Sequence, residues 1–123
     1  MTQQQQLYEE DLIKHPNSQY TFESYGYECT IKRNTTYYCG YITLPINHPY
    51  YNYHQENIPI KVHGGFTYKN NGTFGFDCAH IYDYKYSYPT NDAKATYKDF
   101  EFVKAELVRI SKKFRKIENK TGK

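Results

Sequence analysis

The chain has 123 residues, the usual size of a single domain, and a formal net charge of +3. Its 16 Tyr and 7 Phe argue against disorder, because disordered chains are poor in aromatic residues. No apolar run approaches the roughly 18 residues of a membrane span, and residues 1–10 lack the layout of a signal peptide. We therefore expect a cytoplasmic protein with no membrane partner and with reduced cysteine thiols.

Residues 1–20 are interpreted as a polar leader, in which Leu7, Leu12 and Ile13 allow a short helical stretch before His15-Pro16 ends it. Residues 25–31 then alternate with period two, and residues 37–44 are rich in aromatic and β-branched side chains. Because the link between these two segments is short and polar, the pattern predicts a first β-hairpin.

Residues 46–59 show no clean period and are expected to form a long surface loop, a kind of segment that often carries function. A second hairpin is predicted from residues 58–68 and 73–80. The turn between them contains Asn71-Gly72, the strongest short-range hairpin signal.

The C-terminal part predicts a helix with one apolar stripe, formed by Phe100, Val103, Leu107, Ile110 and Phe114. Thr96 and Asp99 are a plausible capping pair at its start. We therefore predict an α+β fold: an antiparallel β-sheet built from two hairpins and covered on one face by a C-terminal amphipathic helix. The domain would span residues 21–118, followed by a basic tail at 119–123.

Basic residues gather near the C-terminus: Lys112, Lys113, Arg115, Lys116, Lys120 and Lys123. Such a run can contact phosphates, but it is more often a solvated helix end that suits the helix dipole, and we favour that interpretation. The tyrosines of residues 82–97 have only Lys85 and Lys94 among them, a weak signal for stacking on a nucleic acid. The sequence favours a small nucleotide over a polymer.

The second hairpin predicts a cluster of reactive side chains. If Asn71-Gly72 is a two-residue loop, His63 faces His80; if the loop is Asn70-Asn71 or residues 69–72, His63 faces Cys78. Facing residues point to the same side of a sheet, so His63, Cys78 and His80 share one face in either register. Asp77 then points to the opposite face.

A thiol beside an imidazole can become a nucleophile near neutral pH. On this hypothesis Cys78 is the nucleophile, His63 or His80 the base, and Asp77 or Asp83 the group that orients the imidazole. The backbone of Gly64 and Gly65 would admit a ligand and could bind an anion. The alternative is that Cys78 belongs to the core and both histidines are satisfied at strand edges.

A zinc site is a further alternative, with Cys29, Cys39, Cys78 and His80 as ligands. Nine residues separate Cys29 from Cys39, whereas structural zinc sites usually take closely spaced ligand pairs. The leading expectation is therefore that the protein has no cofactor.

Several short motifs in order resemble a family of small phage and bacterial proteins: Gly26-Tyr27-Glu28-Cys29, Cys39-Gly40-Tyr41, His48-Pro49, His63-Gly64-Gly65-Phe66-Thr67 and Gly75-Phe76-Asp77-Cys78-Ala79-His80. The resemblance implies that these motifs form a site. We accordingly expect His48, Tyr41, Thr67 and Tyr82 to contact ligand together with the two glycines. The chain departs from the family by having Thr73-Phe74 where tryptophan is usual and Tyr82 where glycine is usual before Asp83.

These observations predict a virus- or phage-type accessory protein that handles a small, phosphate-bearing ligand at the Cys/His cluster. If the protein is an enzyme, we expect a thiol-dependent hydrolase or transferase. The alternatives are a non-catalytic protein that sequesters such a ligand as a homo-oligomer, and a zinc-stabilised interaction module.

Overall fold

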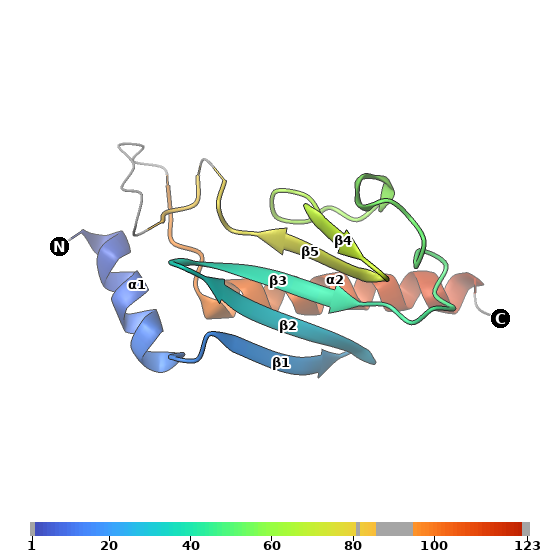
Figure 1. Ribbon diagram of the computed structural model, residues 1–123, viewed down its shortest axis with the longest axis horizontal. Coiled ribbons are helices and arrows are strands. Elements are labelled where there is room, and N and C mark those ends of the chain that lie inside the picture. Colours follow the sequence, from blue (N-terminus) through green and yellow to red (C-terminus); the bar gives the residue numbers. More distant parts are fainter. Residues whose placement is uncertain (1, 81, 86–94, 122–123) are drawn as a thin grey trace.

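A five-stranded antiparallel sheet and a long helix form two layers in the computed structural model, which describes residues 2–80, 82–85 and 95–121 (Figure 1). Helix α2 (Phe100–Thr121) crosses one face of the sheet, so the predicted fold class is confirmed. The strands lie in the order β1-β2-β3-β5-β4, with bounds β1 Gln19–Ser24, β2 Tyr27–Asn34, β3 Tyr37–Thr43, β4 Tyr68–Asn70 and β5 Thr73–Asp77.

The first hairpin pairs β2 with β3 around a two-residue turn, with Asn34 opposite Tyr37. Cys29 and Ile31 alternate with exposed neighbours along β2 and face α2, as the period-two pattern predicts. Strand β1 pairs with the other edge of β2 and was not expected from the sequence. Its two aromatic side chains are only half-buried, so the alternation of apolar and polar residues along β1 is a weak signal for a strand.

Helix α1 (Gln3–Lys14) is longer than the short helical stretch expected in the leader. A capping box between Thr2 and Gln5 satisfies backbone groups at its start. The helix is tied to the rest of the fold by Asp11, which is buried and accepts a hydrogen bond of 2.6 Å from the hydroxyl of Tyr97. The boundaries 1–20, 21–118 and 119–123 stay a prediction, and α2 continues into the last of these segments.

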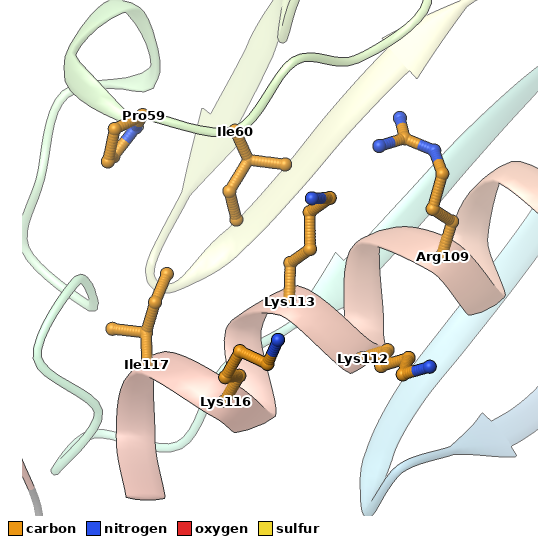
Figure 2. Close-up of a pocket in the computed structure, with 7 residues that line it drawn as sticks. All are labelled: Pro59, Ile60, Arg109, Lys112, Lys113, Lys116 and Ile117. Carbon is orange, nitrogen blue, oxygen red and sulfur yellow. The ribbon is translucent and has the colours of Figure 1, made fainter. Parts of the chain in front are cut away.

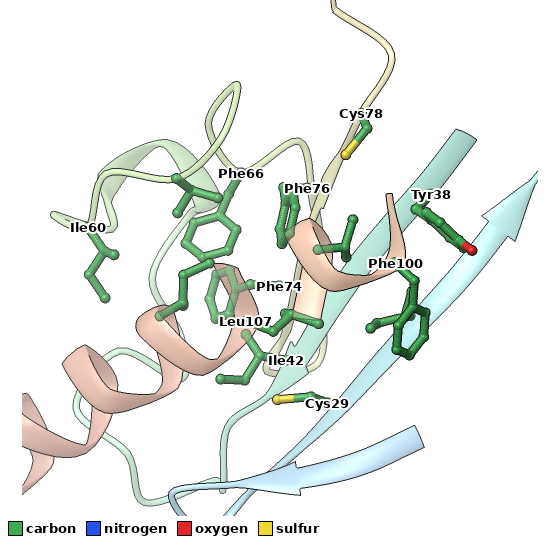
Figure 3. Close-up of a cluster of buried hydrophobic side chains, with 14 of the residues drawn as sticks. Cys29, Tyr38, Ile42, Ile60, Phe66, Phe74, Phe76, Cys78, Phe100 and Leu107 are labelled. Carbon is green, nitrogen blue, oxygen red and sulfur yellow. The ribbon is translucent and has the colours of Figure 1, made fainter. Parts of the chain in front are cut away.

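The core lies between the sheet and α2 (Figure 3). All five side chains of the predicted apolar stripe are buried: Phe100, Val103, Leu107, Ile110 and Phe114. Burial of each stabilises the fold by roughly 1.5–3 kcal/mol. The predicted capping pair of Thr96 and Asp99 is wrong in detail. Asp99, rather than Thr96, is the residue that precedes the helix and caps it, by accepting a hydrogen bond of 2.8 Å from the Phe102 amide.

The second hairpin has the expected two-residue turn, with Asn70 opposite Thr73 and Lys69 opposite Phe74. Asn71 and Gly72 both have positive φ, of 50° and 84°, as a type I′ turn requires. The hairpin is much shorter than predicted, since β4 begins at Tyr68. The long loop predicted for residues 46–59, which contains a 3₁₀ turn at Gln55–Asn57, therefore extends further, to residue 67.

Two glycines explain why the strand does not continue. Gly64 and Gly65 have φ of 67° and 80°, in the left-handed region, and the Gly65 amide donates to the Val62 carbonyl at 2.8 Å. The chain therefore turns at residues 62–65. Among the described residues, no helix is long and apolar enough to cross a membrane.

Candidate functional site

The predicted sheet-face arrangement of His63, Cys78 and His80 does not hold, because none of the three lies in a strand. His63 is in the turn of residues 62–65, and Cys78 and His80 follow the end of β5. The two imidazoles nevertheless lie close together, with ring centroids 5.7 Å apart in an edge-to-face arrangement. Loop geometry, rather than strand pairing, brings them together.

A pair formed by His63 and Asp83 is the centre of the candidate site. Nε2 of His63 lies 3.0 and 2.9 Å from the two carboxylate oxygens of Asp83. Asp83 is 2% exposed, and it also accepts hydrogen bonds of 3.0 Å from the His80 amide and from Nζ of Lys98. Burial alone would raise the pKa of Asp83, but the hydrogen bonds from His63, His80 and Lys98 outweigh it and the pKa is lowered.

The state of the His63 ring follows from this contact. An ionised carboxylate only accepts hydrogen bonds, so Nε2 of His63 carries a proton. In the neutral ring Nδ1 then holds the lone pair, and it has no hydrogen-bond partner among the described residues. Asp83 therefore sets the tautomer and orientation of an imidazole that keeps one nitrogen available, as in a His–Asp proton-transfer pair.

Helix α2 holds the backbone around His63 in place. The His63 amide donates to Glu106 at 2.8 Å, and the same carboxylate is bound by the Arg109 guanidinium at 2.8 and 3.1 Å. Arg109 also donates to the Lys61 carbonyl at 2.6 Å. Residues 61–63 are thus fixed to α2 by charge-assisted hydrogen bonds, which are stronger than neutral ones.

A depression of about 410 Å³ lies beside His63. It is lined by residues of the 61–64 segment and of α2, namely Lys61, Val62, His63, Gly64, Phe102, Glu106 and Arg109. Lys61 and Arg109 bring positive charge to it, although Arg109 is paired with the Glu106 carboxylate in the same lining. The Phe102 ring meets the His63 imidazole edge-on with centroids 5.2 Å apart. The size and lining suit a small ligand with an anionic group.

Cys78 is buried in the core at 2% exposure. Burial and the nearby Asp83 carboxylate raise the pKa of its thiol, so the thiol is protonated at neutral pH. A thiol in this environment is a poor nucleophile. The structure therefore gives Cys78 the properties expected of a core residue.

Asp77 points away from the core-facing Phe76, as alternation along β5 predicts. Its carboxylate accepts hydrogen bonds from the Thr67 hydroxyl at 2.9 Å and from the Ala79 amide at 3.1 Å. Nε2 of His80 lies 3.3 Å from the same carboxylate without forming a hydrogen bond. Asp77 and His80 thus make a second His–Asp contact that is more exposed than the first.

The residues expected to contact ligand do not all meet. Gly64 lines the depression, and Gly65 and Thr67 follow it along the chain. Tyr41 lies on the sheet face away from α2, where its ring meets Tyr68 at 5.4 Å. Tyr82 is exposed, and its carbonyl accepts a hydrogen bond from Lys98.

His48 lies apart from the cluster. It is buried, with Nε2 3.1 Å from the Phe114 carbonyl and Nδ1 accepting from the Tyr50 amide at 3.0 Å. Phe114 is three turns along α2 from Phe102, or roughly 18 Å. His48 therefore fixes the 45–53 loop to the far half of α2.

The alternative zinc set is not assembled. Cys29 faces α2 opposite Ile42, whereas Cys39 pairs with Asp77 and points to the other face. Figure 3 places Cys29 and Cys78 at opposite ends of the core cluster in this view. All three cysteines are free, and the part of the chain that the structure describes contains no metal-holding group of three or more His, Cys, Asp or Glu side chains.

Sequence reasoning missed Lys98, Phe102, Glu106 and Arg109 as parts of the site. All four follow the tyrosine-rich stretch of residues 82–97, of which residues 86–94 lie outside the described residues. Glu106 and Arg109 flank the apolar stripe of α2 at a spacing of three, a signal for a helical ion pair that was available from the sequence.

In comparisons with known proteins, no protein-family model, curated protein or solved structure matches the chain.

Substitution of Gly64 tests the packing of the two histidines. A Cβ at Gly64 would lie 2.0 Å from Nε2 of His80, so we expect Gly64→Ala to displace that ring and destabilise the protein by roughly 2–4 kcal/mol, from overpacking and left-handed strain together. Gly65→Ala is the matched control, because a Cβ there meets nothing within 4 Å and the cost is strain alone, about 1–2 kcal/mol. Urea unfolding would measure both; equal losses would contradict the packing argument.

Proposed function

We propose that this protein binds a small, phosphate-bearing ligand in the depression beside His63, with the His63–Asp83 pair as its proton-transfer group. The assignment to a virus- or phage-type accessory protein that works in the cytoplasm is part of the proposal and rests on the motif resemblance and on the composition. The observation that carries the ligand-binding proposal is a fully buried carboxylate that orients an imidazole at the wall of a depression that also presents Lys61 and Arg109.

Each group would have a distinct task. Lys61 and Arg109 supply positive charge for a phosphate, and the Phe102 ring offers an apolar surface for the rest of the ligand. Nδ1 of His63 would accept a hydrogen bond from the ligand when the ring is neutral and donate one when it is protonated. In a hydrolysis, Nδ1 would take a proton from the attacking water and return it to the leaving oxygen as the scissile bond breaks.

Sequestration without turnover is the second candidate, and one observation favours it. Among the described residues that line the depression, none is Ser, Thr or Cys, and Cys78 is buried. The ligand therefore meets no hydroxyl or thiol nucleophile there. Catalysis would have to proceed by direct attack of water or through the lone pair of His63 itself, and a binding protein needs neither step.

The proposal predicts a ligand-dependent thermal shift that requires His63. Inorganic phosphate and nucleoside mono-, di- and triphosphates would each be added to wild-type protein, His63→Asn and the control His54→Asn, whose side chain is exposed in the loop. A ligand present at 100 times its Kd stabilises the folded state by about 2.7 kcal/mol, which raises the Tm by several degrees. We expect this rise in wild type and His54→Asn and its loss in His63→Asn.

Two outcomes would contradict the proposal: no ligand shifts the Tm, or His63→Asn responds as wild type does. Denaturing the protein after incubation and analysing the ligand by ³¹P NMR separates the two candidates. Intact ligand supports sequestration, and a new phosphorus resonance supports turnover.

A further inference from the structure

The outward face of the C-terminal half of α2 is strongly basic. Arg109, Lys112, Lys113 and Lys116 line a groove of about 560 Å³ whose other wall and floor are Pro59, Ile60 and Ile117 (Figure 2). A second depression of about 350 Å³ continues the surface and is lined by Tyr25, Lys112, Arg115, Lys116, Asn119 and Lys120. Among the described residues, no Asp or Glu lines either depression.

The lysines of this surface, which we call the basic groove, are not neutralised by neighbours. Arg109 is paired with Glu106, and Arg115 lies 3.5 Å from Glu118. Lys112, Lys116 and Lys120 follow one another at intervals of four residues, all exposed, and have no carboxylate within ion-pair distance in the described part of the chain. Like charges at this spacing repel one another, so a partner with regularly spaced negative charges would relieve that repulsion.

The groove also has a fixed apolar floor. Ile60 is 9% exposed, and its segment is held beside α2 by the hydrogen bond from Arg109 to the Lys61 carbonyl. A ligand that follows the groove would meet cations along one side and aliphatic side chains beneath. The cationic stripe from Arg109 to Lys120 is roughly 16 Å long at 1.5 Å per helical residue, which is more than a single phosphate needs.

We propose that the basic groove binds single-stranded nucleic acid, with phosphates on the lysines and bases against Ile60 and Ile117. The basic groove adjoins the His63 depression and shares Arg109 with it, but the other residues that line the groove belong to a separate set and the inference does not depend on the proposed function. An anionic membrane is a poorer partner, because the apolar stripe of α2 is buried in the core and no amphipathic face is left to insert. An acidic peptide is also poorer, since each of its carboxylates must be ordered on a flexible side chain.

The test is the binding of a fluorescein-labelled 12-nucleotide thymidine strand, measured by anisotropy over a range of salt concentrations. Each phosphate contact contributes about 0.7 to the slope of log K against log salt, which amounts to roughly fourfold in affinity at 0.15 M salt. Lys112→Gln/Lys116→Gln removes the two lysines that line both depressions. We expect about 15-fold weaker binding and a slope smaller by about 1.4.

Lys14→Gln/Lys32→Gln is the matched control, because it removes the same charge from α1 and from the far side of the sheet. It should bind within about twofold of wild type. Equal loss in both double variants would show a general charge effect and overturn the proposal, as would absence of binding by the wild type. Tighter binding to a poly-glutamate peptide or to vesicles of anionic phospholipid than to the strand would also overturn it. All four lysines are exposed, so the variants should fold normally, which circular dichroism would check.

Discussion

Asp83→Ala should lower the free energy of unfolding by about 3 kcal/mol or more, because breaking a buried ion pair leaves its partners without compensation. The carboxylate is 2% exposed and accepts from three groups: the His63 ring, the His80 amide and the Lys98 ammonium. Without it, a partly buried lysine and an imidazole lose their shared acceptor. Chemical denaturation at pH 7 would measure the loss.

Asp77→Ala is the matched control, since Asp77 also contacts a histidine and backbone but its side chain is 27% exposed. We expect it to cost about 1 kcal/mol. A loss at Asp83 no larger than that at Asp77 would contradict the role we assign to the buried carboxylate.

The His63–Asp83 pair also makes the stability of the protein depend on pH. The folded-state pKa of Asp83 lies below its usual value of 3.8, so the native state favours the ionised form. The contribution of Asp83 to stability is therefore fully present above the unfolded-state pKa and is lost as pH falls through the folded-state pKa. The difference in stability between wild type and Asp83→Ala should shrink below about pH 4.

Phe114→Ala should destabilise the protein by roughly 3–5 kcal/mol, the range for a buried phenylalanine that leaves a cavity. The side chain is fully buried between α2, the sheet and two loops. Its ring packs against Tyr27, His48, Phe66 and Phe74, with centroids 5.5 to 6.5 Å away. The four segments that carry these rings therefore lose a shared packing partner on α2 in this variant.

Phe102→Ala is the comparison on the same helix, because this ring is 36% exposed. Its removal should cost about 1 kcal/mol, since less apolar surface returns to water. Thermal or urea unfolding of both variants gives the difference. Similar losses at the two positions would show that Phe114 is not central to the core.

Local signals in the sequence were enough to predict the layers of the fold. The apolar stripe of α2, the period-two segment of β2 and the Asn71-Gly72 turn each depend on near neighbours along the chain, and each is present in the structure. Strand β1 was missed because the alternation of its own side chains is weak. Its strand conformation depends on pairing with β2, which occurs only when the sheet forms.

The site was less predictable for a physical reason. We extended the hairpin to His63 on the assumption that alternation continues, but the left-handed conformations of Gly64 and Gly65 end it. The distance between His63 and Asp83 depends on two irregular segments and on Glu106 and Arg109, which lie on another element. No periodicity encodes such a contact. The correct expectation that Asp77 faces away from the core came from the part of β5 that does alternate.

Helix α2 is the last element along the chain, and this position affects how the protein folds during synthesis. All five strands are translated before the helix that covers them, so their helix-facing side chains emerge without a partner: Cys29, Ile31, Ile42, Phe74 and Phe76. A ribosome stalled after β5 has been made and before α2 begins would carry a chain with this apolar surface open to water. Such intermediates aggregate readily, so the nascent sheet is a natural substrate for chaperones until α2 has been made.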